Sequence, residues 1–246
     1  MSNFLVLIPA RLGSTRVAEK MLLEAGGVPL VVHTWRRGSA SEANRVVICA
    51  DHERIAAAAR AHDAEVVLTG PADTGTERLA EASRRLELDD DTIVVNLQGD
   101  EPDMPASVIN ALAAELAAHP EAALATACCP VDEPGQLHDP NVVKVVVDGA
   151  GNALYFSRAT IPFVRDETAA PANHLRHLGI YAYRVKFLRQ FAAWPPTPNE
   201  TVEKLEQLRA LHYGCRIRML FLDQPTPPGI DTESDWQAFA ARTPGS

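Results

Sequence analysis

Cationic and small residues directly follow the first apolar run of the chain. This run covers residues 4–8, Pro9 ends it, and the residues that follow include Ala10, Arg11, Gly13, Ser14, Arg16 and Lys20. Small residues let backbone N–H groups approach a ligand closely, and three cations suit an anion with several charges. The stretch is typical of a phosphate-binding loop, without the glycines and Lys-Ser/Thr pair of the Walker pattern. A solvated surface loop with scattered cations is the alternative interpretation.

Two aspartates could hold a divalent cation near this loop. Asp100 follows the apolar run at residues 92–97, and Arg11 follows the first run. Ligands of open parallel sheets bind at the carboxyl ends of strands, so we expect Arg11 and Asp100 on one rim. One carboxylate is a weak Mg²⁺ site, and Asp231 is the second candidate. The residue pattern alone favours a helix cap for Asp231, because Thr-Glu-Ser-Asp follows it.

A second set of cations lies later in the chain and could bind a carboxylate ligand. It consists of Arg158, Arg165, Arg176 and His177. Arginine binds carboxylates through two parallel hydrogen bonds, although surface charges and a core histidine are the ordinary interpretation.

Apolar runs alternate with helical patterns over residues 1–122. The pattern predicts strands at residues 4–8, 45–50, 65–68 and 92–97. Helices are predicted from Pro29 to about residue 40, after a cap at Asp51, from a Thr74–Glu77 capping box to about residue 85, and from Pro105. Strands that alternate with helices indicate an α/β fold with a doubly wound, mostly parallel central sheet.

The pattern changes after residue 122, where strands follow one another with less helix between them. We expect strands at residues 123–131, 142–148, 153–156 and 178–183, which form a smaller mixed-sheet extension over residues 123–195. Residues 196–246 return to the main domain, with a helix that starts at Thr197-Pro198-Asn199-Glu200, a strand at residues 216–222 and a helix after Thr232. Val202, Leu205, Leu208 and Leu211 should form the core face of the first of these helices. The whole chain is then one compact catalytic unit.

Composition excludes several classes of partner. The chain has 246 residues and a net charge of −9, so binding to nucleic acid or to an anionic membrane is not expected. No apolar run has membrane-spanning length and no signal peptide precedes the first strand, which predicts a cytoplasmic protein. The four cysteines lack metal-ligand spacing and are expected to be reduced, mostly buried thiols.

Several motifs, in one order along nearly the whole chain, resemble the 3-deoxy-manno-octulosonate cytidylyltransferase (CMP-KDO synthetase) family. They are Ile8-Pro9-Ala10-Arg11, Ser14-Thr15-Arg16 with Lys20, Gly75-Thr76-Glu77-Arg78, Asn96-Leu97-Gln98-Gly99-Asp100-Glu101-Pro102, Asn141-Val142-Val143-Lys144, Tyr155-Phe156-Ser157-Arg158, Leu175-Arg176-His177-Leu178-Gly179-Ile180-Tyr181, Leu205-Glu206-Gln207-Leu208-Arg209 and Gly229-Ile230-Asp231-Thr232. The resemblance implies a nucleotide-diphospho-sugar transferase-like fold. It also implies transfer of CMP from CTP to 3-deoxy-manno-octulosonate (KDO) with release of pyrophosphate, as a step of lipopolysaccharide synthesis.

The resemblance also implies site residues, a cofactor and a partner. Asp100 and Asp231 match the metal-binding aspartates for Mg²⁺, and with Lys20 and Arg11 they make up the implied catalytic set. The implied nucleotide-binding residues are Ala10, Arg11, Ser14, Arg16, Lys20, Gly75, Arg78 and Asp100. The implied sugar-binding residues are Gln98, Arg158, Arg165, His177, Tyr181, Glu206 and Gln207. A homodimer built largely through the mixed-sheet extension is implied as well.

One segment departs from the family pattern. Where the family usually has Leu-Pro-Gly before its loop lysine, this chain has Val17-Ala18-Glu19 before Lys20. Neighbouring side chains of an extended loop point to opposite sides, so we expect that Glu19 does not neutralise Lys20. Two alternatives remain open: a cytidylyltransferase for another sugar acid, either amino-KDO or sialic acid, and a non-catalytic nucleotide-sugar sensing module.

Overall fold

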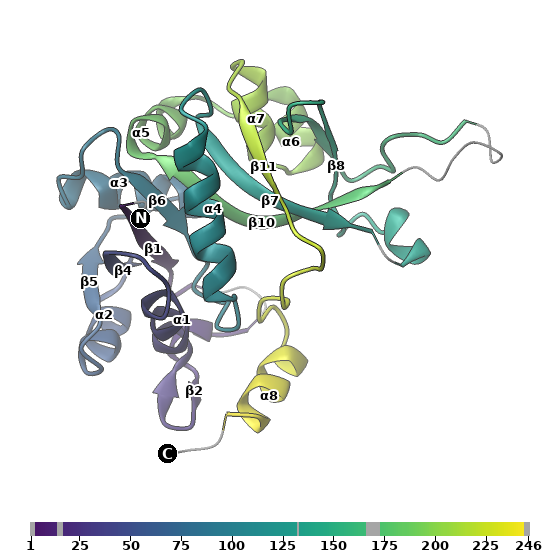
Figure 1. The fold of residues 1–246 in the computed structure, drawn as a ribbon. Helices are drawn as coiled ribbons and strands as arrows, with labels where there is room; N and C mark the ends of the chain where they lie inside the picture. Colours follow the sequence, from purple (N-terminus) through teal and green to yellow (C-terminus); the bar gives the residue numbers. More distant parts are fainter. Residues whose placement is uncertain (1–2, 14–16, 132, 166–172, 244–246) are drawn as a thin grey trace.

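A central sheet runs through the molecule, which is a computed structural model (Figure 1). The structure describes residues 3–13, 17–131, 133–165 and 173–243. Within them the central sheet has nine strands, with the order β11-β7-β10-β6-β1-β4-β5 and with β8 and β9 extending from β10. The strands are β1 (Phe4–Ala10), β4 (Arg45–Ala50), β5 (Glu65–Leu68), β6 (Ile93–Asn96), β7 (Leu124–Pro130), β8 (Lys144–Val147), β9 (Ala153–Ser157), β10 (Leu175–Arg184) and β11 (Ile217–Phe221). A separate small antiparallel sheet pairs β2 (Glu24–Ala25) with β3 (Val28–Pro29).

The central sheet is mostly parallel, as the sequence predicts. β1 is parallel to β4 and β6, β4 is parallel to β5, and β7 is parallel to β11. β10 runs antiparallel to both of its neighbours, β6 and β7, so it alone is reversed in the ordered path β11 to β5 of the described chain. The carboxyl ends of β1 and β6 therefore lie on the same rim.

Helices cover both faces of this sheet, and each face has its own hydrophobic core. One core includes side chains of α1 (Leu30–Ser39), α2 (Glu53–Arg60), α4 (Ala106–Ala118) and α8 (Glu233–Ala241). The other includes side chains of α3 (Gly75–Arg85), α5 (Val185–Ala193) and α7 (Gln207–His212). Alternate residues of a strand face opposite sides, so Val6 and Ile8 enter the first core and Leu7 enters the second. The predicted doubly wound α/β fold is confirmed.

Two predicted helix starts differ in detail. The side chain that caps α2 is that of His52, which accepts a hydrogen bond from Arg54 N, so the predicted cap at Asp51 is wrong. Asp51 instead accepts a hydrogen bond from Leu12 N. At α3, Thr74 accepts from Glu77 N as expected, but the Glu77 carboxylate accepts from Asp73 N. Side chains of short loops have several backbone donors within reach, which the spacing of a motif does not separate.

The predicted helix at Thr197 is two helices. α6 (Pro198–Glu203) has the expected capping box, but Lys204 adopts a left-handed conformation and ends it before α7 begins. Val202 is consequently 83% exposed, so its predicted place on the core face is wrong. Helix α5, between β10 and α6, is absent from our sequence-based expectations; it follows its strand directly, without a side-chain cap.

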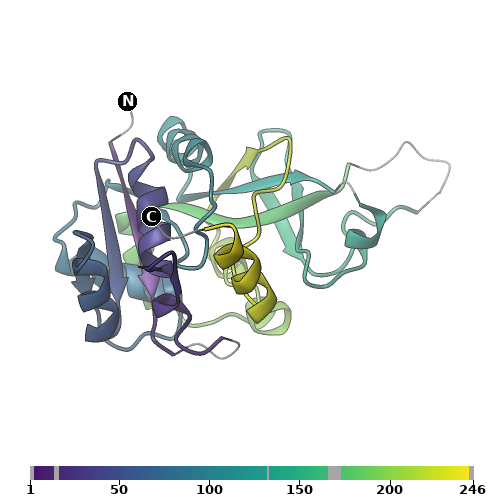
Figure 2. The same cartoon turned by 90° about the horizontal axis from the view of Figure 1, so that it is seen from below.

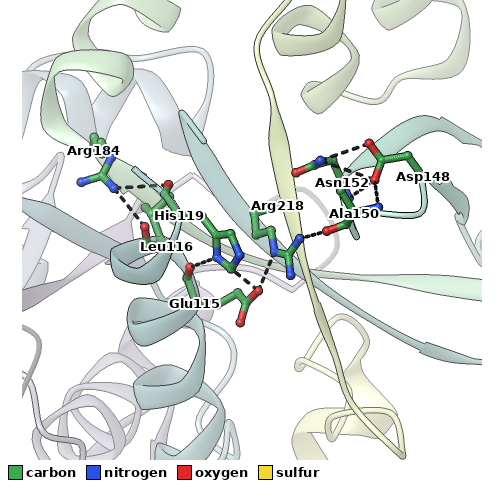
Figure 3. A network of polar contacts seen from close by, with 8 residues as sticks. All are labelled: Glu115, Leu116, His119, Asp148, Ala150, Asn152, Arg184 and Arg218. Atoms are coloured by element: carbon green, nitrogen blue, oxygen red, sulfur yellow. Dashed lines mark hydrogen bonds and ion pairs between the residues drawn. The ribbon is translucent and has the colours of Figure 1, made fainter. Parts of the chain in front are cut away.

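A polar network fixes the turn between β8 and β9 to the rest of the fold (Figure 3). Arg218 of β11 lies between Glu115 of α4, at 2.6 Å from Nε to Oε1, and the carbonyl oxygen of Ala150 in the turn. Gly151 has a φ of +83°, and a Cβ there would lie 2.8 Å from Arg218 Nη1. Only glycine fits this close approach without a shift. The smaller mixed-sheet extension is therefore anchored to both α4 and β11.

The three predicted segments share the central sheet. β7 and β10 lie between β11 and β6, so residues 123–195 contribute strands to the middle of the sheet, and residues 196–246 contribute β11. We propose on this basis that the segments 1–122, 123–195 and 196–246 form one catalytic unit. All four cysteines have free thiols, and three of them are buried. Among the described residues no helix is long and apolar enough to span a membrane.

Candidate active site

Asp100 stands in a tight turn just beyond the end of β6. Gly99 makes this turn possible, because a Cβ there would lie 2.8 Å from Met21 Sδ and 2.9 Å from the carbonyl oxygen of Pro9. Thr34 of α1 donates a hydrogen bond to the Gly99 carbonyl oxygen at 2.8 Å. The turn thus packs against the end of β1, and the Asp100 carboxylate is held beside the loop that follows β1.

Lys20 directs its ammonium group at this carboxylate. It opens a short 3-10 helix, η1 (Lys20–Leu22), and its side chain is only 9% exposed. Its Nζ lies 2.6 Å from Asp100 Oδ2, 2.6 Å from the Ile230 carbonyl oxygen and 3.7 Å from Asp231 Oδ1. A buried ammonium requires such partners, since burial without them disfavours the charge.

The segment before α8 brings Asp231 to the same place. Ile230 N donates to the Asp100 carbonyl oxygen at 2.8 Å, which fixes this segment against the Asp100 turn. Thr232 is the N-cap of α8 and forms a capping box with Asp235, so the helix-cap interpretation of Asp231 is wrong. The Asp231 carboxylate, whose side chain is 61% exposed, faces the cluster formed by Lys20 and Asp100.

A cavity of about 370 Å³ opens on this cluster. As expected from the strand order, Arg11 and Asp100 both line it. Of the residues assigned to nucleotide, metal or catalysis, it is lined by Ala10, Arg11, Lys20, Gly75, Arg78, Asp100 and Asp231. The assigned residues Ser14 and Arg16 lie outside the part of the chain that the structure describes. Arg78 is buried, and its Nη1 donates to Thr69 Oγ1 at 2.6 Å.

Glu101 adds an unusual carboxyl next to the cluster. Its Oε2 is buried without a hydrogen-bond partner in the described residues. Burial, with the neighbouring charges of Asp100 and Asp231, raises the pKa of Glu101 to about 8. The group therefore stays protonated near neutral pH and adds no charge to the two aspartates.

The residues assigned to the sugar begin at the cavity and continue along the second face of the sheet. Gln98 lines the cavity and donates to Asn96 Oδ1 at 3.3 Å, and Tyr181 of β10 stands opposite Asn96. The His177 ring centroid lies 5.5 Å from that of Tyr181. Burial lowers the pKa of His177 to about 3 and raises that of Tyr181, so both rings are neutral at pH 7.

Glu206 and Gln207 lie beside the same region. Glu206 Oε2 accepts a hydrogen bond from Thr76 Oγ1 at 2.9 Å, next to the cavity residue Gly75. Glu206 Oε1 and Gln207 Nε2 are buried, and neither has a hydrogen-bond partner in the described part of the chain. Buried polar atoms of this kind are costly unless a ligand or water satisfies them. Burial raises the pKa of Glu206.

Arg158 and Arg165, the two arginines assigned to the sugar, do not line the cavity. Arg158 donates from Nε to the Glu203 carbonyl oxygen and from Nη1 to that of Pro140, both at 2.6 Å. It therefore holds the end of α6, three residues before Glu206. Arg165 is exposed at the end of the described stretch 133–165 and does not line the cavity.

Comparisons with known proteins place these features in a family. The sequence pattern described as cytidylyltransferase matches residues 5–217. The chain belongs to the cytidylyltransferase family. A protein of Polynucleobacter asymbioticus named 3-deoxy-manno-octulosonate cytidylyltransferase is 47% identical, over 95% of this chain and 92% of that protein. A protein of Halorhodospira halophila with the same name is 48% identical, over 97% of this chain and 96% of that protein.

A solved structure of the family has the same fold. It is described as CMP:2-keto-3-deoxy-manno-octonic acid synthetase complexed with CTP, and it superposes with a TM-score of 0.90. The two chains are 34% identical and each is covered over 98% of its length. A cytidylyltransferase from Leptospira borgpetersenii, at 16% identity and a TM-score of 0.63, shares the fold.

Sequence reasoning did not assign several residues that shape the cavity. These are Pro9, Met21, Ala72, Asp73, Thr74 and Gly99. Gly99 could have been found, because a glycine directly before a rim aspartate signals a close approach of two backbones. For the segment from Ala72 to Thr74 the sequence predicts only a helix cap. Its position at the cavity depends on how α3 packs against the sheet.

The arrangement suits a polyanionic ligand that carries a divalent cation. Two carboxylates, at Asp100 and Asp231, stand beside the cations Lys20 and Arg11 on one rim. Among the described residues no group of three His, Cys, Asp or Glu side chains could hold a metal by itself. Mg²⁺ sites commonly use one or two carboxylates and take their other ligands from substrate phosphates and water, and this cluster fits that pattern.

Proposed function

We propose that this chain transfers CMP from CTP to KDO, giving CMP-KDO and pyrophosphate. The observation that carries this proposal is the meeting of Lys20, Asp100 and Asp231 at one cavity in a cytidylyltransferase fold. Relatives that match it over nearly their whole length bear the name of this activity. The implied role in activating KDO for lipopolysaccharide synthesis belongs to the same proposal.

The triphosphate of CTP would lie over the rim formed by the ends of β1 and β6. Lys20 and Arg11 contribute positive charge there, with Ser14 and Arg16 as further proposed contacts from the undescribed part of the loop. Ala10 and Gly75 line the cavity without bulky side chains, which leaves room for the nucleotide. Arg78 braces the cavity wall through Thr69 and is the proposed contact at the base end.

We propose Mg²⁺ as the cofactor, held by Asp100 and Asp231. The carboxylates already face a cation, the Lys20 ammonium, which shows that their positions suit positive charge. Mg²⁺ held by these two carboxylates would neutralise negative charge that develops on the triphosphate. Lys20 would then be free to contact the phosphates, because the metal takes its place on the carboxylates.

The sugar acid would occupy the region from Gln98 to Glu206 and Gln207. The partnerless buried atoms Glu206 Oε1 and Gln207 Nε2 support this, because a polyhydroxylated ligand supplies the missing hydrogen bonds. Tyr181, opposite Asn96 in the sheet, and the neighbouring His177 offer neutral rings. Arg158 and Arg165 complete the proposed sugar set, the first by positioning α6 and the second as an exposed cation.

In the proposed reaction the anomeric hydroxyl of KDO attacks the α-phosphorus of CTP. A new O–P bond forms, the hydroxyl gives its proton to water, and the bond from the α-phosphorus to the bridging oxygen of the departing pyrophosphate breaks. The protein has little covalent work to do, so positioning and charge stabilisation carry the rate enhancement. Lys20, Arg11 and Arg16 stabilise the departing pyrophosphate.

We also propose a cytoplasmic homodimer without nucleic-acid or membrane partners. The net charge of −9 disfavours anionic polymers and surfaces. The extension projects from the main body on the side of β8 (Figures 1 and 2). Phe163, in this extension, is 83% exposed. Exposed aromatic side chains of this kind are typical of protein interfaces.

Release of pyrophosphate from CTP tests the proposed activity. The enzyme is assayed with Mg²⁺ and with KDO, amino-KDO, sialic acid or no sugar, and the nucleotide product is identified by mass spectrometry. We expect KDO-dependent release and CMP-KDO as the product. Faster turnover with sialic acid or amino-KDO would assign the site to that sugar acid, and no turnover with any sugar would support a non-catalytic module.

A matched pair of lysine variants tests the site itself. Lys20→Ala should lower kcat/KM for CTP by roughly a hundredfold, because a charge contact of the triphosphate is lost. Lys186→Ala removes an exposed lysine of α5 and should leave kcat/KM within twofold. Equal values for the two variants would remove Lys20 from the mechanism.

A further inference from the structure

The start of α2 fastens the loop between β1 and η1 at two points. Leu12 N donates to Asp51 Oδ1 at 2.9 Å, which holds the beginning of the loop. At its end, both terminal nitrogens of Arg54 bond the Glu19 carboxylate, with 2.7 Å from Nη2 to Oε2. Asp51 and Arg54 lie only three residues apart, so the start of α2 contacts both ends of the loop.

Glu19 has a backbone conformation that its side chain does not favour. Its φ is +48° and its ψ is +34°, in the left-handed region, where a Cβ makes the backbone crowded. Glycine is the residue that ordinarily fills such a position, and glycine is also what the family pattern has before its loop lysine. The expectation of an extended loop at Glu19 is therefore wrong.

This conformation determines where Lys20 points. The Glu19 carbonyl oxygen accepts from Leu22 N at 2.8 Å and so starts η1, whose first residue is Lys20. From there the Lys20 side chain runs inward to Asp100, whereas the Glu19 side chain runs outward to Arg54. Glu19 and Lys20 thus have separate partners, and the expectation that Glu19 does not neutralise Lys20 is met.

The ion pair between Arg54 and Glu19 lies at the surface, so its strength depends on its hydrogen-bond geometry. The side chains of Arg54 and Glu19 are 54% and 47% exposed. Exposed pairs contribute little on average, and those with two parallel hydrogen bonds are the exception. The mutual hydrogen bonds raise the pKa of Arg54 and lower that of Glu19, so both groups are charged over the whole range in which enzymes are assayed.

We propose that Arg54 is a positioning residue for the phosphate loop. By holding the Glu19 carboxylate, it keeps Glu19 in the left-handed conformation that directs Lys20 toward the triphosphate. Arg54 thus stabilises a backbone conformation that glycine would adopt without help, because glycine has no Cβ. The proposal rests on the proposed function, since it takes the loop and Lys20 as the triphosphate site.

The test compares Arg54→Ala in the natural chain and in a Glu19→Gly background. In the natural chain we expect KM for CTP to rise about five- to tenfold and KM for KDO to change less than twofold. In the Glu19→Gly background, Arg54→Ala should change KM for CTP less than twofold, because glycine adopts the conformation unaided. Glu19→Gly alone should stay within twofold of the natural chain.

Two further variants separate geometry from charge. Arg54→Lys keeps the charge without the paired hydrogen bonds, so its KM for CTP should lie between those of the natural chain and Arg54→Ala. Arg60→Ala is the matched control, because Arg60 lies on the same helix, is 48% exposed and pairs with Glu53 away from the loop. A rise in KM that is equal in both backgrounds would overturn the proposal, because Arg54 would then act without Glu19.

Amide hydrogen exchange without substrate supplies a readout independent of the reaction. In Arg54→Ala, peptides that cover residues 17–23 should exchange several-fold faster, and the Glu19→Gly background should remove most of this difference. Unchanged exchange in Arg54→Ala would overturn the proposed positioning. Faster exchange with an unchanged KM for CTP would instead overturn the assignment of the loop to CTP, so the two failures are distinguishable.

Discussion

Single residues of the site are arranged so that opposite charges meet at the rim of the sheet. Lys20 lies between Asp100 and Asp231, and its contact with Asp100 spans only 2.6 Å. The protonated Glu101 keeps a third negative charge away from this group. The proposed Mg²⁺ and triphosphate would bring charges of both signs to this cluster.

Replacing Asp100 tests the proposed metal site. Asp100→Asn keeps the shape of the side chain but removes its charge, so kcat should fall by roughly a hundredfold or more. Asp103→Asn is the control, because Asp103 lies in the same segment and pairs with Arg242 away from the cavity. Steady-state rates are measured over a Mg²⁺ titration, with circular dichroism to show that both variants fold. A near-normal kcat in Asp100→Asn would exclude Asp100 from the reaction.

Replacing Arg158 tests its link to the proposed sugar-binding residues. Arg158→Ala leaves the carbonyl groups of Glu203 and Pro140 without their donors, and α6 should shift near Glu206. We expect KM for KDO to rise by about one to two decades, equivalent to about 1.5–3 kcal/mol, and KM for CTP to change less than twofold. Steady-state kinetics with each substrate varied in turn gives both values. Equal rises for the two substrates would contradict the assignment.

Strand β10 is the element that joins the two regions of the site. It pairs with β6 next to Asn96, with β7 along most of its length and with β8 at its start. A register shift between Leu178 and Tyr181 separates the part of the strand that pairs with β8 from the part that pairs with β6. His177 lies just before this shift, 2.9 Å from Thr126 Oγ1 and edge-on to Phe156.

The buried ring of His177 predicts a loss of stability in acid. Burial lowers its pKa from the ordinary 6.5 to about 3, so the unfolded chain binds more protons between these pH values. Stability should therefore be intact above pH 6.5 and be lost as the pH falls, by up to about 1.4 kcal/mol per pH unit from this group. Urea unfolding at pH 7 and pH 5 should show a smaller loss for His177→Gln than for the natural chain. An equal loss in both would mean that other groups carry the acid sensitivity.

Phe163 and Val202 are the most exposed large apolar residues in the described part of the chain, and they can be compared directly. Phe163 belongs to the extension, and Val202 lies on α6; each is 83% exposed. If the extension forms the proposed dimer, Phe163→Glu should shift the enzyme toward monomer, because a charge enters the apolar interface. Val202→Glu is the matched control and should leave the mass unchanged. Light scattering after size-exclusion chromatography measures the mass, and a monomeric natural chain would contradict the dimer.

The sequence by itself determined the elements of the nucleotide half and the rim on which the site lies. The apolar run at residues 4–8 lies within the buried strand β1, and the run at residues 92–97 contains the buried strand β6. Parallel strands present their carboxyl ends together. Arg11 and Asp100 therefore had to face one cavity. The capping boxes at Thr197 and Thr232 also follow from local hydrogen bonding, which needs only neighbouring residues.

Only the tertiary structure decided the relations between distant segments. Asp231 reaches Asp100 because Ile230 N bonds the Asp100 carbonyl oxygen, a contact that no local pattern contains. The division of α6 from α7 at Lys204 and the outward position of Val202 depend on packing that overrides a continuous helical period. The left-handed Glu19 is the clearest case, because local preference opposes it and a side chain 35 residues away, Arg54, holds it in place.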